Sequence, residues 1–79
     1  MELIPTAIKT ETYKAIDGFL IDIEDDGECY NAYIWHEKIG VKDLMFGMLK
    51  TDISKESFID LVKANFEDYR AFFEEDYMD

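Results

Sequence analysis

Two Asp-Gly dipeptides, Asp17-Gly18 and Asp26-Gly27, constrain the fold of this 79-residue chain more than any other feature. They stand nine residues apart, and hydrophobic residues alternate with polar ones around them. Asp-Gly between alternating segments is the strongest short-range signal of a β-hairpin, because both residues tolerate the positive φ that tight turns need. The sequence therefore predicts two consecutive hairpins with positive φ at Gly18 and Gly27.

The register of the second hairpin follows from which side chains would share a face. A two-residue loop at Asp26-Gly27 pairs Ile23 with Tyr30 and gathers hydrophobic residues on one side of the sheet. A three-residue loop would instead place Asn31 opposite Ile21 among them, so the two-residue loop is predicted. The resulting apolar face consists of Phe19, Ile21, Ile23, Tyr30, Ala32 and Ile34.

The first hairpin favours a three-residue loop, Ile16-Asp17-Gly18, with Gly18 in the left-handed bulge position. This loop pairs Tyr13 with Ile21 on the apolar face and Thr12 with Asp22 on the other face. Together the two hairpins predict a three-stranded antiparallel meander over residues of about 9–15, 19–24 and 29–36.

The segment after the meander has hydrophobic residues at helical spacing. Val41, Leu44, Met45, Met48 and Leu49 fall at i, i+3, i+4, i+7 and i+8, which predicts a short helix with one buried stripe. Gly47 lies inside this segment and lowers its helix propensity by about 1 kcal/mol. A buried strand over residues 41–49 is therefore the alternative.

A long C-terminal helix has a clear start signal. Ser54 is a favourable N-cap, and Ile53 and Phe58 occupy the two positions of a hydrophobic staple. We expect this helix to run to the C-terminus, to cover the apolar sheet face, and to bury Phe66 fully at its middle. Its apolar stripe consists of Phe58, Leu61, Val62, Phe66, Tyr69, Phe72 and Phe73. The predicted fold is a single small acidic α+β domain over residues 1–79, with the structure of residues 1–8 left open.

The charge balance excludes several classes of function. Eight basic residues against 19 acidic ones give a net charge of 8 − 19 = −11. Phosphate contacts and anionic lipids both require a cationic surface, so we expect neither direct nucleic-acid binding nor membrane association. The sequence also shows no apolar run long enough for a membrane span and no basic leader. A single cysteine, which leaves no internal disulfide, fits the reducing cytoplasm.

One acidic motif suggests metal binding. Asp22-x-Glu24-x-Asp26-Gly27 matches four positions of a calcium loop, whose twelfth position requires a bidentate glutamate. Tyr33 occupies that position here, and the segment resembles a strand entering a turn. We therefore interpret the motif as a solvated acidic hairpin and predict no metal or other cofactor.

Catalytic groups are equally sparse. Cys29 and His36 stand seven residues apart on one predicted strand, and an odd separation sends their side chains to opposite faces. They therefore cannot form a nucleophile–base pair within one chain. Glu24, expected beside Cys29, also disfavours the thiolate. A small enzyme or metal-dependent module is the least favoured hypothesis, and we predict a protein without catalytic activity.

The leading hypothesis is a cytoplasmic interaction module that binds a basic surface of another protein, with aromatic anchors ringed by carboxylates. The alternative is a housekeeping domain that forms a homodimer and whose acidity serves only solubility. In composition the chain resembles small acidic inhibitors of phages and mobile elements, such as anti-restriction and anti-CRISPR proteins, which implies a charge mimic of nucleic acid. The candidate partner-binding residues are Asp22, Glu24, Asp25, Asp26, Glu28, Tyr33, Trp35, Glu74, Glu75 and Asp76.

Overall fold

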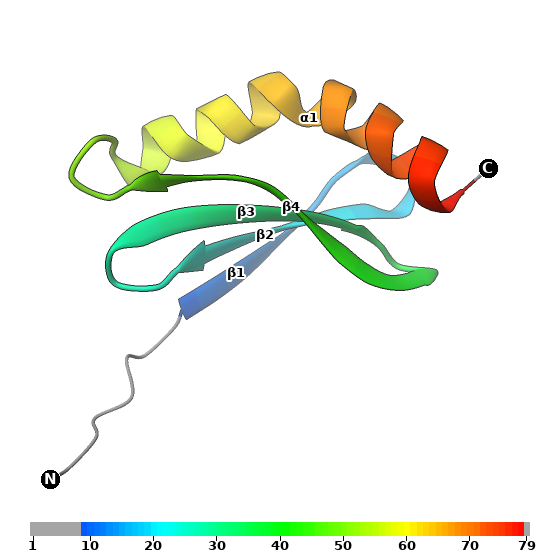
Figure 1. Cartoon of the computed structure of the whole chain (residues 1–79), viewed down its shortest axis with the longest axis horizontal. Coiled ribbons are helices and arrows are strands. Elements are labelled where there is room, and N and C mark those ends of the chain that lie inside the picture. The colour runs from blue at the N-terminus through cyan, green and yellow to red at the C-terminus, as the bar shows by residue number, and fades with distance from the viewer. Residues whose placement is uncertain (1–8, 79) are drawn as a thin grey trace, which may run out of the picture.

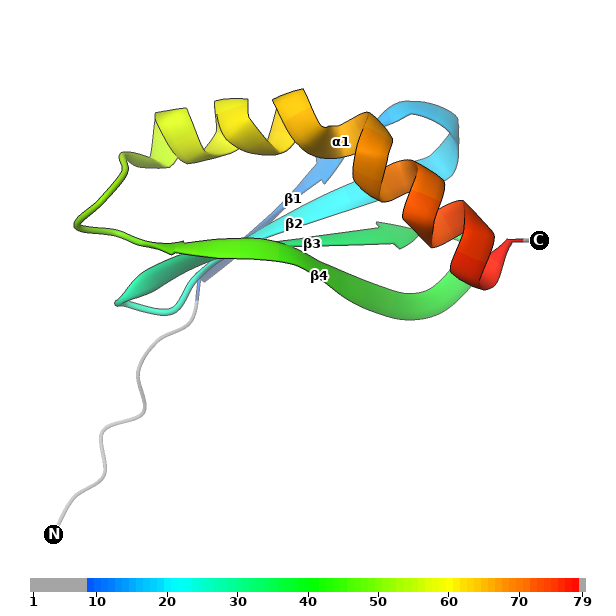
Figure 2. The ribbon, with the colours of Figure 1, turned by 45° about the horizontal axis from the view of Figure 1, so that its top comes forward.

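The computed structural model describes residues 9–78, so the open question about residues 1–8 lies outside the described part. A four-stranded antiparallel sheet has its strands in the order β1-β2-β3-β4, and one long helix lies over one face (Figures 1 and 2). The elements are β1 (Lys9–Lys14), the 3-10 turn η1 (Ile16–Gly18), β2 (Phe19–Asp25), β3 (Cys29–His36), β4 (Ile39–Leu49) and α1 (Lys55–Tyr77). The α+β class and the antiparallel meander are confirmed, but the sheet has four strands where three were predicted.

The short helix predicted over residues 41–49 is wrong, because this segment forms β4, the fourth strand of the sheet. A β-bulge explains the misleading spacing: Ala32 of β3 pairs with Phe46, and Tyr33 pairs with Leu44, so Met45 is an extra residue. The bulge lets Met45 and Phe46 both face the helix, while Leu44 faces outward. The bulge interrupts the alternation of the strand, so the hydrophobic residues of β4 have the spacing that is typical of a helix.

Gly47 of β4 makes room for a neighbouring side chain. A Cβ at this position would overlap the Asn31 amide oxygen and lie 3.2 Å from the Tyr30 carbonyl oxygen. Gly47→Ala is therefore expected to lower the free energy of unfolding by about 1–3 kcal/mol, measured by urea denaturation. Gly40→Ala in the same strand is the matched control, because a Cβ there meets nothing within 4 Å. Equal losses in the two variants would contradict this account.

The first hairpin has the predicted register. Tyr13 pairs with Ile21 and Thr12 pairs with Asp22 across a loop of residues 16–18. Gly18 has φ 84°, and Asp17 before it also has a positive φ of 58°. The three-residue loop with a left-handed glycine is therefore confirmed.

The second hairpin has the predicted face but a different register. Gly27 has the expected positive φ of 96°, but Ile23 pairs with Ala32 and Asp25 pairs with Tyr30, two residues beyond the predicted pairing. The loop residues are Gly27 and Glu28, because the Asp26 N–H bonds to the Cys29 carbonyl at 3.2 Å. A shift of two residues keeps every side chain on its expected face.

The C-terminal helix begins as predicted. Ser54 is the N-cap, and its hydroxyl accepts the Ser57 N–H at 3.2 Å. The core forms where α1 meets the predicted apolar face, and all six residues of that face are buried. The complete buried hydrophobic set is Phe19, Ile21, Ile23, Tyr30, Ala32, Ile34, Met45, Phe58, Val62 and Phe73.

The predicted apolar stripe of the helix is only partly buried. Phe66, expected to be fully buried, is half-buried, and Leu61 and Phe72 are exposed. The helix packs chiefly on β3 and β4, so its side toward β1 stands over an open groove. This off-centre position of α1 leaves Phe66 half-buried at the groove.

Candidate functional site

The predicted partner-binding residues do not form one surface. Four lie on β2 and β3 and point away from α1, three lie in or beside the β2–β3 turn, and three lie in the last turn of α1. Figures 1 and 2 show the β2–β3 turn and the C-terminus of α1 at opposite ends of the molecule. The three groups are Asp22, Glu24, Tyr33 and Trp35; then Asp25, Asp26 and Glu28; then Glu74, Glu75 and Asp76.

Asp22 is the centre of a buried polar network on the outer sheet face. Its side chain accepts hydrogen bonds from Lys42 Nζ at 2.6 Å, Thr12 Oγ1 at 2.8 Å and Trp35 Nε1 at 3.1 Å. Burial alone would raise the pKa of Asp22, but the bonds from Lys42, Thr12 and Trp35 outweigh it and hold the pKa below its ordinary value. Asp22 is only 3% exposed, so it stabilises the sheet and is not available to a partner.

Trp35 also belongs to this network. Its indole N–H is bonded to Asp22, and the Lys42 ammonium lies 4.8 Å from the ring centroid, within cation–π range. Both the polar edge and one face of the half-buried indole are therefore engaged within the chain. Tyr33 lies beside the same lysine at a shallow outer-face hollow.

The carboxylates of the β2–β3 turn are largely engaged as well. Both oxygens of Asp25 lie 2.9 Å from Lys50 Nζ, and this bond, followed by one from the Gly27 N–H, lowers its pKa. Asp26 accepts the Cys29 N–H at 2.7 Å and the Glu28 N–H at 2.9 Å, and these bonds lower its pKa.

The hydrogen bonds accepted by Asp25 and Asp26 stabilise the turn, and they occupy carboxylate oxygens that a bound cation would require as ligands. Glu24 accepts the Asn31 amide at 3.3 Å. Within residues 9–78, no group of three or more acidic, histidine or cysteine side chains is arranged to hold a metal ion. Glu28 is the exposed carboxylate of the turn.

Cys29 and His36 lie on opposite faces of β3, as predicted. Burial, and then the charges of Asp26 and Glu28, raise the pKa of the Cys29 thiol. His36 is buried on the helix side, where Nδ1 accepts the Lys38 N–H at 3.1 Å and Nε2 lies 3.0 Å from the Asp17 carbonyl oxygen. Nδ1 therefore stabilises the turn between β3 and β4, and Nε2 contacts the loop between β1 and β2.

Among the aromatic residues of the described chain, Phe72 of α1 is the most exposed, at 61%. Its ring lies 6.4 Å from that of Tyr69, which in turn lies 6.0 Å from that of Phe46 on β4. Exposed Leu61 shares its face of the helix, since the two residues are three turns apart. The sequence pattern predicts both residues in the buried stripe, and this is wrong.

A signal in the sequence distinguishes them. Phe72-Phe73 and Leu61-Val62 are adjacent pairs, and neighbours on a helix point about 100° apart, so only one of each pair can face the sheet. Val62 and Phe73 are the buried members.

Two exposed carboxylates accompany these hydrophobic side chains. Leu61, Asp68, Phe72 and Glu75 stand at i, i+7, i+11 and i+14, one stripe about 21 Å long that we call the acidic helix surface. Asp68 and Glu75 have no ion pair among residues 9–78. Of the predicted residues, Glu75 lies in this surface, Asp76 is exposed beside it, and Glu74 forms an ion pair with Arg70 at 3.4 Å.

Comparison of the chain with protein-family models, curated proteins and solved structures gave no match in any of the three. Within residues 9–78, α1 is the long helix, and its sequence is too polar to cross a membrane. What the chain binds is therefore inferred from its own surface chemistry.

Proposed function

We propose that this protein is a non-catalytic cytoplasmic module that binds a basic surface of another protein through its acidic helix surface. The observation that carries the proposal is the exposure of Phe72 between Asp68 and Glu75, two carboxylates without an ion pair in the described chain. A large aromatic side chain that inserts into a partner's pocket, with charged groups around it, is the typical composition of an interface hot spot.

The distribution of charge supports this choice of surface. Helix α1 carries three basic and seven acidic residues, a net charge of 3 − 7 = −4. Two of its cations, Lys55 and Arg70, form ion pairs toward the sheet side with Glu11 and Asp17. The solvent-facing side of the helix is therefore strongly negative and attracts a basic partner over long range.

The end of α1 adds a second argument. Glu74, Glu75 and Asp76 stand in the last turn, where no basic residue accompanies them. Negative charge at a helix C-terminus opposes the macrodipole and lowers stability. A partner with a basic surface, such as a nucleic-acid-binding protein, would reverse this effect in the complex.

The experiment compares two charge-matched double variants in affinity capture and in titration of the captured partner. Asp68→Asn/Glu75→Gln is expected to weaken binding about tenfold, slow association and flatten the salt dependence. Phe72→Ala is expected to weaken binding about 30-fold, mainly through faster dissociation. The control, Glu28→Gln/Glu37→Gln, removes the same charge from exposed turns and is expected to retain affinity.

Two results would contradict the proposal. Equal weakening by the control would mean that net charge alone determines binding. A tight dimer in sedimentation, abolished by Phe72→Ala, would instead support the alternative, a homodimer whose acidity serves solubility.

A further inference from the structure

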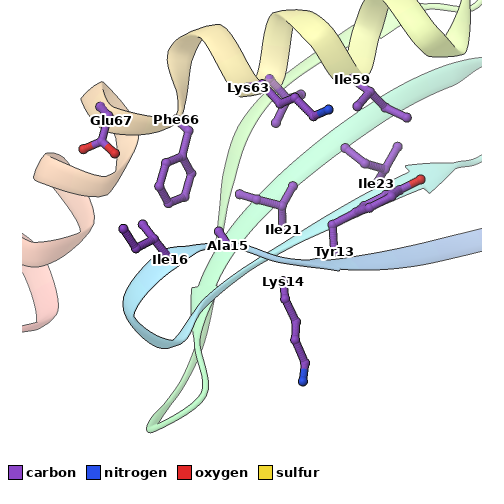
Figure 3. Close-up of a pocket in the computed structure, with 11 residues that line it drawn as sticks. Tyr13, Lys14, Ala15, Ile16, Ile21, Ile23, Ile59, Lys63, Phe66 and Glu67 are labelled. Carbon is purple, nitrogen blue, oxygen red and sulfur yellow. The ribbon is translucent and has the colours of Figure 1, made fainter.

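An open apolar groove lies between α1 and the β1 side of the sheet. Its volume is about 360 Å³, and Figure 3 shows Ile21 and Ile23 pointing from the sheet toward α1, with Phe66 pointing down from the helix. The side chains that line it are chiefly apolar, among them Tyr13, Ile16, Ile21, Ile23, Ile59 and Phe66. Exposed apolar surface of this kind is typical of a binding site.

Two ion pairs link α1 to the β1 side of the sheet at the ends of the groove. Lys55 of α1 pairs with Glu11 of β1, and Arg70 pairs with Asp17 of η1 at 2.6 Å. The two helix residues are 15 positions apart, which is about 22 Å along the helix axis. This length matches that of β1, whose six residues extend over about 20 Å.

Strand β1 is an edge strand of the sheet, and within residues 9–78 no strand pairs with its outer side. The Ala15 N–H bonds to the Phe19 carbonyl at 2.8 Å, so Ala15 and every second residue before it form the hydrogen-bonded pairs with β2. The intervening residues, Thr10, Thr12 and Lys14, therefore direct their backbone N–H and C=O groups toward the open edge of the sheet. An edge of this kind accepts an additional strand.

The charge around the groove is opposite to that of the whole protein. Lys9 and Lys14 stand at the two ends of β1, and Lys63 stands on α1 at the groove. The Lys14 side chain lies at the strand edge on the outer sheet face and points away from the groove (Figure 3). None of these three lysines has an ion pair among residues 9–78, in a chain whose net charge is −11. The carboxylates at the groove, Glu11, Asp17 and Glu67, are each paired with Lys55 or Arg70. The unpaired charges around the groove are therefore those of the lysines, which suit a carboxylate.

We propose that β1 binds an extended segment of another protein by strand addition, with apolar side chains at alternate positions in the groove and carboxylates at its ends beside the lysines. This site is separate from the acidic helix surface and takes a partner of opposite charge. A second copy fits less well, because its β1 strand would pair Thr12 with Thr12 and Thr10 with Lys14, and it carries lysines at its ends where the groove favours carboxylates. A small apolar molecule would leave the strand edge unpaired.

The test uses a synthetic peptide of about seven residues, with valine at alternate positions, threonine between them and glutamate at both ends. Titration is followed by NMR hydrogen exchange of the full chain. Binding is expected to protect the amides of Thr10, Thr12 and Lys14 about tenfold. Thr10→Pro removes an edge-facing N–H at a position where an edge strand tolerates proline, and is expected to weaken binding at least tenfold. Thr10→Val keeps the N–H and is expected to bind normally.

Charge and groove variants complete the test. Lys14→Glu is expected to weaken binding of the glutamate-ended peptide and to favour a lysine-ended one. Ile16→Asn alters the groove wall and is expected to weaken binding, whereas Leu44→Asn on the outer sheet face is a control of equal exposure, 58% against 57%.

Three outcomes would overturn the proposal. One is unchanged binding in Thr10→Pro that remains folded by circular dichroism. Another is equal affinity of wild type for both peptides. The third is competition by decanoate that is insensitive to Thr10→Pro, which would indicate a small-molecule site.

Discussion

Replacing Phe58 with alanine is expected to lower the free energy of unfolding by about 3–5 kcal/mol. The side chain is fully buried, and its ring centroid lies 5.6 Å from that of Tyr30 on β3 and 5.4 Å from that of Phe46 on β4. Phe58 therefore fixes the first turns of α1 to two strands at once. A chain of this length has a total stability of roughly 4–12 kcal/mol, so the variant is expected to be largely unfolded near physiological temperature.

Phe66→Ala is the matched control, because it removes the same atoms from the same helix. Phe66 is half-buried, lies beside the open groove, and contacts Phe19 at a centroid distance of 6.1 Å. Truncating it is expected to cost about 1–2 kcal/mol, since less apolar surface returns to water. Urea denaturation with a common m-value measures both losses. Equal losses would contradict the position of α1 over β3 and β4.

The two hairpins are predictable because their signals are local. An Asp-Gly turn and a run of alternating residues fix which side chains face the core, and both hairpins are contained in residues 9–36. The register of the second hairpin depends on a different contact, the Asp26 carboxylate bonded to the Glu28 and Cys29 N–H groups. With that contact, the loop consists of Gly27 and Glu28 instead of Asp26 and Gly27. Both loops place the same side chains on the core face, so the alternation of hydrophobic residues cannot distinguish them.

Strand β4 is harder to predict because its pattern depends on its partner. The bulge at Met45 and the glycine at position 47 make sense only opposite β3, where Asn31 fills the space that Gly47 leaves. Without that partner, the same residues show helical spacing. Tertiary pairing thus overrides a local preference.

The error over residues 41–49 also explains why the candidate site differs from expectation. A helix in this segment leaves Lys42 and Lys50 away from the hairpin, so Asp22 and Asp25 are expected to be free. In the structure β4 brings both lysines beside these carboxylates. Of the predicted residues, Glu28 of the turn and Glu75 and Asp76 of α1 remain exposed. On α1, adjacent hydrophobic pairs such as Phe72-Phe73 also leave one member exposed.

Asp22→Asn is expected to lower the free energy of unfolding at neutral pH by about 2–3 kcal/mol. The amide keeps the shape of the carboxyl group but loses the charge that faces Lys42. Its NH₂ group is also a donor and cannot accept the bonds that an oxygen of Asp22 receives. The buried position of Asp22 means that water does not replace these bonds.

The same network makes stability depend on pH. The pKa of Asp22 is lower in the folded protein than its ordinary value, so the unfolded chain binds the proton more readily. The stabilisation is therefore complete above the unfolded pKa, near 3.9, and is lost as the pH falls from there through the folded pKa. Glu11, Asp25 and Asp26 also have lowered pKa values and contribute in the same direction.

Urea denaturation between about pH 2 and pH 7 is expected to show a smaller loss of stability on acidification in Asp22→Asn than in the wild type. Thr12→Val is the control, because it removes one donor and leaves the carboxylate with Lys42 and Trp35. It is expected to retain most of the pH dependence and to cost about 1 kcal/mol at neutral pH. Trp35 is the single tryptophan, so its fluorescence reports protonation of Asp22 directly. An identical loss of stability on acidification in Asp22→Asn and wild type would show that other carboxylates account for the acid sensitivity. The network around Asp22 would then not stabilise the sheet through the charge of Asp22.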